Sequence, residues 1–482
     1  MEQKRHRSAA LRKYLTMRIY FPSLILLIAG SLLAGCASLR TDKSHYAGIE
    51  RLLKTGDYSI AIKRLEDQKH QAYTRKDRVV YYLDLGMLHH WNGDYAKSNE
   101  QLEKAERGIE ANFTKSISRS ASAMLMNDNI LAYAGEDYED IYLNAFKALN
   151  YLALGQTDEA FVEVRRINNK LIQLESKHDR VARKLNRAEE AKETFVPGKS
   201  HFQESALGRY LSLLLYRNDS KWDDVRIDLE KIGRGWKLQP DIYTFPQPDF
   251  SRSTQRINAP TARLNVVAFS GLAPDKKATT FYIHTEENRI ILAGSAENYL
   301  GRQNLLGLHV IPWYGVGAGT HFKIQLPYMQ RRISNVGRIE IEVVGRGTVP
   351  LQPLESLENV AVETFGIQKP LVYLKTVTRA VAKGLAAEQA KQKMTENMDA
   401  GIAFFARLAA DLMVDTTENA DLRLSRFFPA EAAIREIHLA EGRYDIRIHY
   451  YSPGNTLLYT DERTGVNIEA GRLNVLESAY LN

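Results

Sequence analysis

The sequence predicts an α+β fold in which an all-helical N-terminal part precedes a β-rich part. Glycine-led helical motifs recur between residues 56 and 167, and after a proline-rich stretch the apolar period changes from helical to two. The 482 residues are also too many for one ordinary domain. We therefore expect a helical domain at 45–237, a linker at 238–261 and a β-rich domain at 262–482.

The N-terminus indicates export and lipidation. Basic residues precede an apolar run that ends in Leu33-Ala34-Gly35-Cys36. Small residues before the cysteine suit a signal peptidase, and the four residues resemble a bacterial lipobox. We expect residues 1–35 to be removed as a signal peptide, whether translation starts at Met1 or Met17. Cys36 would then carry palmitate-type acyl chains on a tether at 36–44. The alternative, an uncleaved membrane helix, needs ~20 apolar residues.

Removal of residues 1–35 nearly neutralises the chain. The formal charge is +7, from 65 Lys and Arg against 58 Asp and Glu. The leader holds six of the basic residues and one acid, which leaves 65−6 = 59 against 58−1 = 57, a net charge of +2. Nucleic-acid binding therefore loses its main support. Because Cys36 is the only cysteine, we expect no disulfide and no thiolate metal site, and we predict no cofactor and no metal.

The helical domain contains a recurring start signal. Gly56-Asp57-Tyr58, Gly93-Asp94-Tyr95 and Gly155-Gln156-Thr157 each precede small and apolar residues one helical turn apart. Glycine can end one helix in a left-handed conformation, and the following residues begin its partner. The pattern resembles tetratricopeptide repeats, with inserts because the intervals are irregular. The alternative is a set of generic antiparallel helix hairpins.

A long helix follows the third motif. Apolar positions from Val164 to Ala188 alternate three and four residues apart, which predicts a heptad seam. His178 falls in this seam, either as a pH-sensitive position or as a polar residue wetted near the surface.

The β-rich domain has two groups of strands around a helical insert. We expect strands at 263–269, 281–285, 289–292, 322–326 and 338–344, and again near 433–439, 444–448, 456–459, 466–469 and 473–476. The insert, about 371–414, is expected to begin after Pro370. Its apolar segment 400–414 is too short to span a membrane, so it fills a core or lies in a membrane interface.

No catalytic motif stands out. The glycine-rich stretch 315–320 lacks the lysine of a phosphate loop and precedes a strand, which favours a flexible loop. Neighbouring Trp313 and Tyr314 form an aromatic ligand platform or anchor the loop. His89 and His90 point apart on a helix, and His309 and His321 lack an evident acidic partner. We predict a protein without catalytic residues.

Several short motifs carry a family resemblance. They are Tyr210-Leu211-Ser212, Gly271-Leu272-Ala273-Pro274-Asp275-Lys276, and Ala420-Asp421-x-Arg423 before Pro429-Ala430-Glu431. With the helix from Leu371, they make the mature chain resemble a family of largely uncharacterised bacterial lipoproteins with a tetratricopeptide-like N-terminal half. This chain has Leu422, Leu424 and Ser425 where the family tends to have Thr, Ser and Trp. If those residues form a functional loop in relatives, that function is in question for this chain. The resemblance implies envelope work, as companions of penicillin-binding-protein activator lipoproteins.

Together these features predict a lipid-anchored cell-envelope scaffold that faces the periplasm. The residue after the cysteine is Ala37, not Asp. This resembles the sorting pattern of lipoproteins that go to the outer membrane, so we expect that location. We expect an envelope protein or peptide as partner, bound on a concave helical surface, and a glycan is possible. Candidate contacts are Tyr82, His89, Tyr95, Tyr133, Tyr151, Trp313 and Tyr314. The alternatives are a hydrolase acting on peptidoglycan or polysaccharide, and a structural subunit of an export or surface assembly.

Overall fold

A computed structural model describes residues 46–119, 126–188, 193–297, 303–395 and 419–482. The chain is mixed, with helices in the N-terminal half and several mainly antiparallel sheets in the C-terminal part, and this confirms the α+β class. The predicted signal peptide, Cys36 and the apolar segment 400–414 lie outside the described residues.

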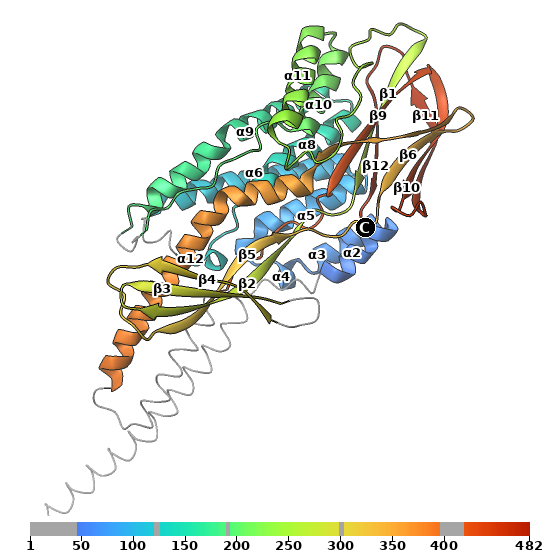
Figure 1. Ribbon diagram of the computed structural model, residues 1–482. Coiled ribbons are helices and arrows are strands. Elements are labelled where there is room, and N and C mark those ends of the chain that lie inside the picture. The colour runs from blue at the N-terminus through green and yellow to red at the C-terminus, as the bar shows by residue number, and fades with distance from the viewer. Residues whose placement is uncertain (1–45, 120–125, 189–192, 298–302, 396–418) are drawn as a thin grey trace, which may run out of the picture.

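The N-terminal half consists of consecutive helix pairs (Figure 1). The pairs are α2 (Tyr46–Thr55) with α3 (Tyr58–Asp67), α5 (Arg78–Trp91) with α6 (Tyr95–Ser118), α8 (Asp137–Ala153) with α9 (Thr157–Leu185), and α10 (Ala206–Asn218) with α11 (Trp222–Leu238). A short helix, α4 (Lys69–Ala72), and two 3-10 turns, η2 (Arg75–Asp77) and η3 (Asp128–Ile130), lie between them. Gly56, Gly93 and Gly155 all have positive φ angles between the paired helices, as the motif predicts.

The two helices of a pair differ in burial. The first helices α5, α8 and α10 are buried on nearly every side, whereas α6 and α9 bury one stripe each. In α9 the buried stripe includes Val164, Ile167, Leu171 and Leu174, which are residues of the predicted heptad seam. The first helices are enclosed because their partners cover one side and the C-terminal half of the chain covers the other.

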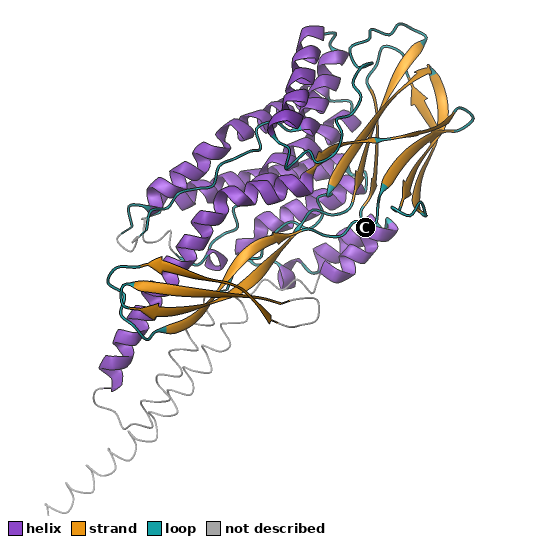
Figure 2. Ribbon diagram, viewed as in Figure 1, coloured by secondary structure: helices purple, strands orange, loops and turns teal. Residues whose placement is uncertain are grey.

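Two four-stranded sheets pack face to face as a sandwich (Figure 2). One sheet has the order β12-β1-β9-β8 and the other β11-β10-β6-β7. Their strands are β1 (Thr261–Ser270), β6 (Arg338–Val343), β7 (Gly347–Pro350), β8 (Gln352–Ser356), β9 (Glu431–Ala440), β10 (Gly442–Tyr451), β11 (Leu457–Ile468) and β12 (Asn474–Tyr480). The β1–β12 pair is parallel, and the other pairs of these two sheets are antiparallel.

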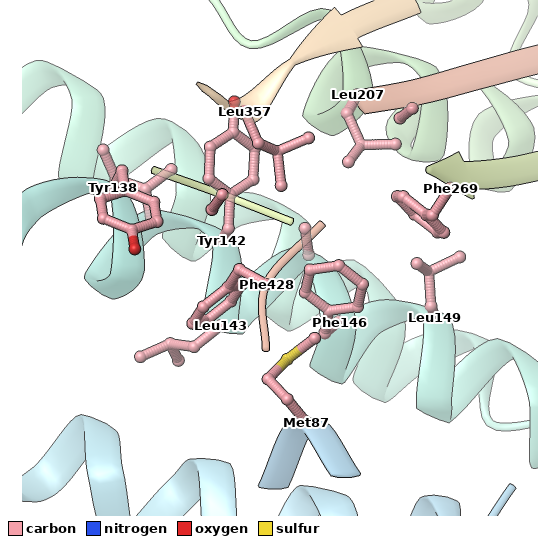
Figure 3. Packing of buried hydrophobic residues seen from close by; sticks show 14 of the residues in the cluster. Met87, Tyr138, Tyr142, Leu143, Phe146, Leu149, Leu207, Phe269, Leu357 and Phe428 are labelled. Atoms are coloured by element: carbon pink, nitrogen blue, oxygen red, sulfur yellow. The ribbon is translucent and has the colours of Figure 1, made fainter. Parts of the chain in front are cut away.

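Strand β1 joins the sandwich to the helices because both of its faces are buried. Leu264 and Val266 face the interior of the sandwich, while Val267 and Phe269 face the helices. The ring centroid of Phe269 lies 5.3 Å from that of Phe146 on α8. Figure 3 shows these rings among side chains from α5, α10, α12 and the residue Phe428. The helical half and the sandwich therefore share one apolar core.

The third sheet stands apart from this core. Strands β2 (Asp275–Glu286), β3 (Arg289–Glu297), β4 (Gln303–Pro312) and β5 (His321–Gln330) are antiparallel in the order β4-β3-β2-β5. One face packs on α12 (Leu357–Thr395) through a small cluster that includes Ile283, Trp313, Ile324 and Val381. We call this sheet, with α12 beyond Pro370, the arm, because it projects from the rest of the molecule, the body (Figure 1).

Helix α12 corrects one sequence prediction. It begins at Leu357, not after Pro370, and Pro370 lies inside it. Proline lacks the N–H that would bond to the carbonyl of residue 366. Nearby, the Gly198 N–H donates to the carbonyl oxygen of Ile367 at 2.8 Å from the strap around residue 198. The proline that was expected to precede the helix is therefore an internal residue of α12.

Several strand predictions also differ from the structure. Strands β4, β7 and β8 were not predicted, and β11 is one strand where two short ones were expected. Its pairing with β10 shifts register between Val466 and Arg463, so that Thr464 and Gly465 form a bulge. Gly465 has a φ of 65°, a conformation that glycine adopts without strain.

Candidate functional site: a buried polar junction

The segment 419–430 crosses the boundary between the helical half and the sheets. Its apolar side chains Leu424, Phe427 and Phe428 belong to the shared core. Its polar groups meet charged side chains from three other stretches of the chain. We call this cluster the polar junction, and its members are Asp77, Asp84, Glu136, Glu139, Lys276, Asp421, Arg423, Ser425 and Arg426.

Arg423 is the best-connected group of the junction. It is 3 % exposed and pairs with the Asp421 carboxylate at 2.7 Å and with the Asp77 carboxylate at 3.3 Å. It also donates to the carbonyl oxygens of Leu131 and Asp128 at 2.9 and 2.7 Å. Burial alone would raise the pKa of Asp421, but the Arg423 guanidinium holds it well below its usual range. Arg423 thereby ties its own segment to the loop that precedes α8.

Ser425 bridges two buried carboxyl groups of the helical half. Its backbone N–H donates to Glu139 Oε1 at 2.6 Å, and its hydroxyl donates to Asp84 Oδ1 at 2.9 Å. The N–H of Arg426 reaches the same Asp84 oxygen at 3.0 Å. Burial raises the pKa of Glu139 to about 8 and that of Asp84 to about 6, although the donated hydrogen bonds oppose the shift.

The motif 271–276 enters the junction from the other side. Lys276 pairs with Glu136, which also accepts a hydrogen bond from Gln368 of α12. The Ala273 N–H donates to the carbonyl oxygen of Phe428 at 2.9 Å. Asp275 binds the guanidinium of Arg426 at 2.5 Å. The two stretches that carry the family resemblance, 271–276 and 420–431, are thus in direct contact.

A cavity of about 220 Å³ adjoins the junction between the ends of α6 and α9, α12 and residues 419–423. Three pairs of opposite charges line it: Lys375 with Asp128, Lys276 with Glu136, and Lys177 with Asp137 at 2.7 Å. Burial alone would raise the pKa of Asp137, but Lys177 and His178 lower it. A carboxylate whose pKa is lowered in this way, as in Asp137, is a weak base. The arrangement favours binding or rigid positioning over proton transfer.

The predicted contact residues of the helical half take different positions. Tyr133 is buried in the junction, where its hydroxyl donates to Glu139 Oε2 at 2.7 Å. His89 is buried with Nδ1 3.1 Å from an oxygen of Asp94. Tyr82 and Tyr151 are half-buried against the shared core, and Tyr95 is half-buried with its ring 6.0 Å from His90.

The two aromatic residues of the glycine loop are separated. Trp313 is buried in the arm, whereas Tyr314 is 80 % exposed. His321 stacks on His284 of the neighbouring strand with ring centroids 4.3 Å apart. His178 of the seam is buried and lies 2.6 Å from Asp137. Within the described part of the chain, no three His, Cys, Asp or Glu side chains are grouped as metal ligands would be.

The sequence did not identify the polar junction as a site. Asp84, Glu136 and Glu139 lie on helices or at their starts, where carboxylates are usually solvated. The available signal was the pair of motifs Gly271–Lys276 and Asp421–Arg423, which indicated family but not contact.

No family model, curated protein or solved structure matches this chain. Over the residues that the structure describes, no helix is long and apolar enough to cross a membrane.

Proposed function

We propose that the chain is a lipid-anchored scaffold of the bacterial cell envelope that faces the periplasm from the outer membrane and binds an envelope protein. The lipobox-like Leu33-Ala34-Gly35-Cys36 supports the anchor, and the residue after the cysteine supports the membrane. The glycine-led helix pairs support a tetratricopeptide-like helical half.

The observation that carries the proposal is the division into a body and a projecting arm (Figure 1). The free end of the arm is formed by the β2–β3 turn and the loop 312–320, which we call the tip. Asn288 holds the two together: its backbone oxygen accepts from Trp313 N–H at 2.8 Å, and its side-chain oxygen accepts from Gly315 N–H at 2.8 Å. The glycine loop is therefore fastened to its neighbour, and it displays Tyr314.

A rigid, exposed tyrosine suits a protein-binding contact. Tyrosine buries a large area at a low cost in conformational entropy, and it is enriched among residues that dominate binding energy. The space beside Gly315, Gly317 and Gly319 is also open, since no other atom lies within 4 Å of where a Cβ would be. We assign the tip as the partner-binding contact, with Tyr314 at its centre.

The polar junction supports a role without catalysis. Glu136 is engaged by Lys276 and Gln368, and Asp421 by Arg423. A hydrolase acting on peptidoglycan would need one of these carboxylates free to exchange a proton with substrate. The paired arrangement instead fastens the segment 419–430 to the body and so fixes the base of the arm.

Site-specific photocrosslinking in cells tests the proposal. A photoreactive amino acid replaces Tyr314, and a matched control replaces Ile172 on α9, which is equally exposed at 80 %. We expect an adduct with one defined envelope protein from position 314 and none from position 172. Adducts that are the same at both positions would contradict the assignment. Turnover of purified sacculi by the form Ala37–Asn482 would contradict the scaffold.

The anchor has its own test. Cys36→Ser is expected to leave the protein unprocessed or to release it from the outer-membrane fraction. Normal processing and fractionation of that variant would refute lipidation at Cys36.

A further inference from the structure

The first helix pair has an excess of exposed positive charge. Between residues 46 and 77 the exposed cations are Arg51, Lys54, Lys63, Arg64, Lys69 and Arg75, which we call the basic face. The exposed acids of the same stretch are Asp57, Glu66 and Asp67, so the excess is 6−3 = 3. None of the six cations forms an ion pair with another described residue. The remaining acids Glu50 and Asp77 face inward to Arg426, Arg332 and Arg423.

The first helix pair brings two of these cations, Arg51 and Arg64, close together. Gly48 of α2 has no side chain, and the guanidinium of Arg64 on α3 occupies the space where a Cβ would be, with Arg64 Cζ 2.4 Å from that position. Arg51 follows Gly48 by one turn and so lies on the same side of α2 as Arg64. Ile60 adds an exposed apolar side chain on α3 at 54 %.

The position of this pair in the chain indicates what it faces. Tyr46, the first residue of α2, is ten residues beyond Cys36. Even a fully extended tether spans no more than about 3.5 Å per residue, about 35 Å in all. If Cys36 carries lipid, as the proposed function holds, α2 and α3 are the first described elements after the anchor and lie within that reach of the bilayer.

We propose that the basic face binds the anionic phospholipid surface of the membrane that holds the lipid anchor. Unpaired Lys and Arg side chains gain attraction to acidic headgroups without first breaking an ion pair. Acyl chains and basic residues together give a membrane attachment that neither provides alone. Binding in this way fixes the orientation of the body, so that α2 and α3 lie against the bilayer and the tip is held in one direction.

Vesicle binding by the unlipidated form Ala37–Asn482, which retains every described residue, tests the proposal separately from the anchor. The vesicles contain phosphatidylglycerol mixed with phosphatidylcholine, or phosphatidylcholine alone. We expect binding to the anionic vesicles only, lost as salt is raised toward about 1 M, where the screening length falls to ~3 Å. Absence of binding to anionic vesicles at low salt would overturn the proposal and leave lipidation of Cys36 untouched.

Matched triple variants locate the contact. Arg51→Gln, Lys54→Gln and Lys63→Gln together should weaken binding about 100-fold, at about fivefold per cation near the surface. The control combines Arg165→Gln, Arg183→Gln and Lys237→Gln on α9 and α11, which are also exposed and lie away from α2 and α3 in Figure 1. It should change binding less than about threefold, since charges beyond a screening length contribute little. Equal losses in the two variants would show that the attraction is not specific to the basic face. Circular dichroism on both variants checks that the fold is retained.

Discussion

The body and the arm differ in how their hydrophobic cores are built. In the body, residues from α2 to the last residues of the chain share one core, so that distant stretches depend on each other. The arm buries a small separate cluster between one sheet and one helix. The body is therefore expected to unfold as a unit, although its sequence divides into a helical part and a β-rich part, while the arm can open without it.

The largest expected effect lies at the polar junction. Arg423→Met leaves the buried Asp421 and Asp77 carboxylates without their cation and should lower the free energy of unfolding by about 3–5 kcal/mol. Urea unfolding followed by circular dichroism measures it. Arg447→Met is the control, because Arg447 forms its ion pairs on the exposed face of β10 and should alter stability little. If the two variants were equally stable, the junction would not hold the body together.

A pair of aromatic truncations tests the independence of the two regions. Phe428→Ala in the shared core and Trp313→Ala in the arm should each cost about 3–5 kcal/mol where they act. Limited proteolysis shows which region of the molecule each substitution destabilises. Phe428→Ala should expose sites in both the helical half and the sandwich, whereas Trp313→Ala should expose sites in β2–β5 alone. Cleavage in α5 or α8 caused by Trp313→Ala would mean that arm and body are one unit.

A pH dependence distinguishes the body further. Glu355 of β8 accepts hydrogen bonds from Tyr142, Tyr243, Ser205 and the Leu207 N–H, and burial raises its pKa to about 7. The folded state then holds a proton that the unfolded chain releases near its ordinary pKa of 4.5. This contribution is complete below pH 4.5 and is lost as the pH rises through 7, by up to ~1.4 kcal/mol per pH unit.

Glu355→Gln removes that ionisation and keeps the shape of the side chain. We expect the variant to lose less stability than the parent between pH 5 and pH 8 in urea titrations at both pH values. If the variant and the parent lost the same stability, the pH dependence would come from other groups. Glu139 and Asp84 are candidates, because burial raises their pKa values as well.

The smallest expected change in stability is at the tip. Tyr314→Ala removes an exposed side chain and should leave the melting temperature unchanged, within about 0.5 kcal/mol in free energy. The same change should reduce recovery of the partner from crosslinked membranes, and Ile172→Ala should not. A destabilised Tyr314→Ala variant would mean that the tip supports the fold of the arm.

The sequence predicted the helices better than it predicted the contacts between them. Gly56, Gly93 and Gly155 were predictable helix ends, because the positive φ angle at a helix end depends on the local sequence and glycine adopts it without strain. The prediction of a helix start after Pro370 was wrong, because α12 begins at Leu357 and continues through the proline. The stretch predicted as a linker at 238–261 lies between α11, which ends at Leu238, and β1, which begins at Thr261.

The polar junction was beyond sequence reasoning for a physical reason. Periodicity identifies the buried face of a helix, but it does not identify which distant segment covers that face. Asp84 and Glu139 accept hydrogen bonds from tyrosines of the helical half and also from Ser425 and Arg426, more than two hundred residues away in the chain. The sequence proposed Trp313 and Tyr314 as one aromatic pair, and only the structure separates the buried ring from the exposed one.

Hydrogen exchange across a denaturant series, on the form Ala37–Asn482, tests the central claim most directly. The account predicts that α5, α8, β1 and β9 exchange through one common opening with the same dependence on denaturant, and that β2–β5 open at lower free energy. Separate openings for the helical half and the sandwich would contradict a shared body. A common opening that includes β2–β5 would contradict an independent arm.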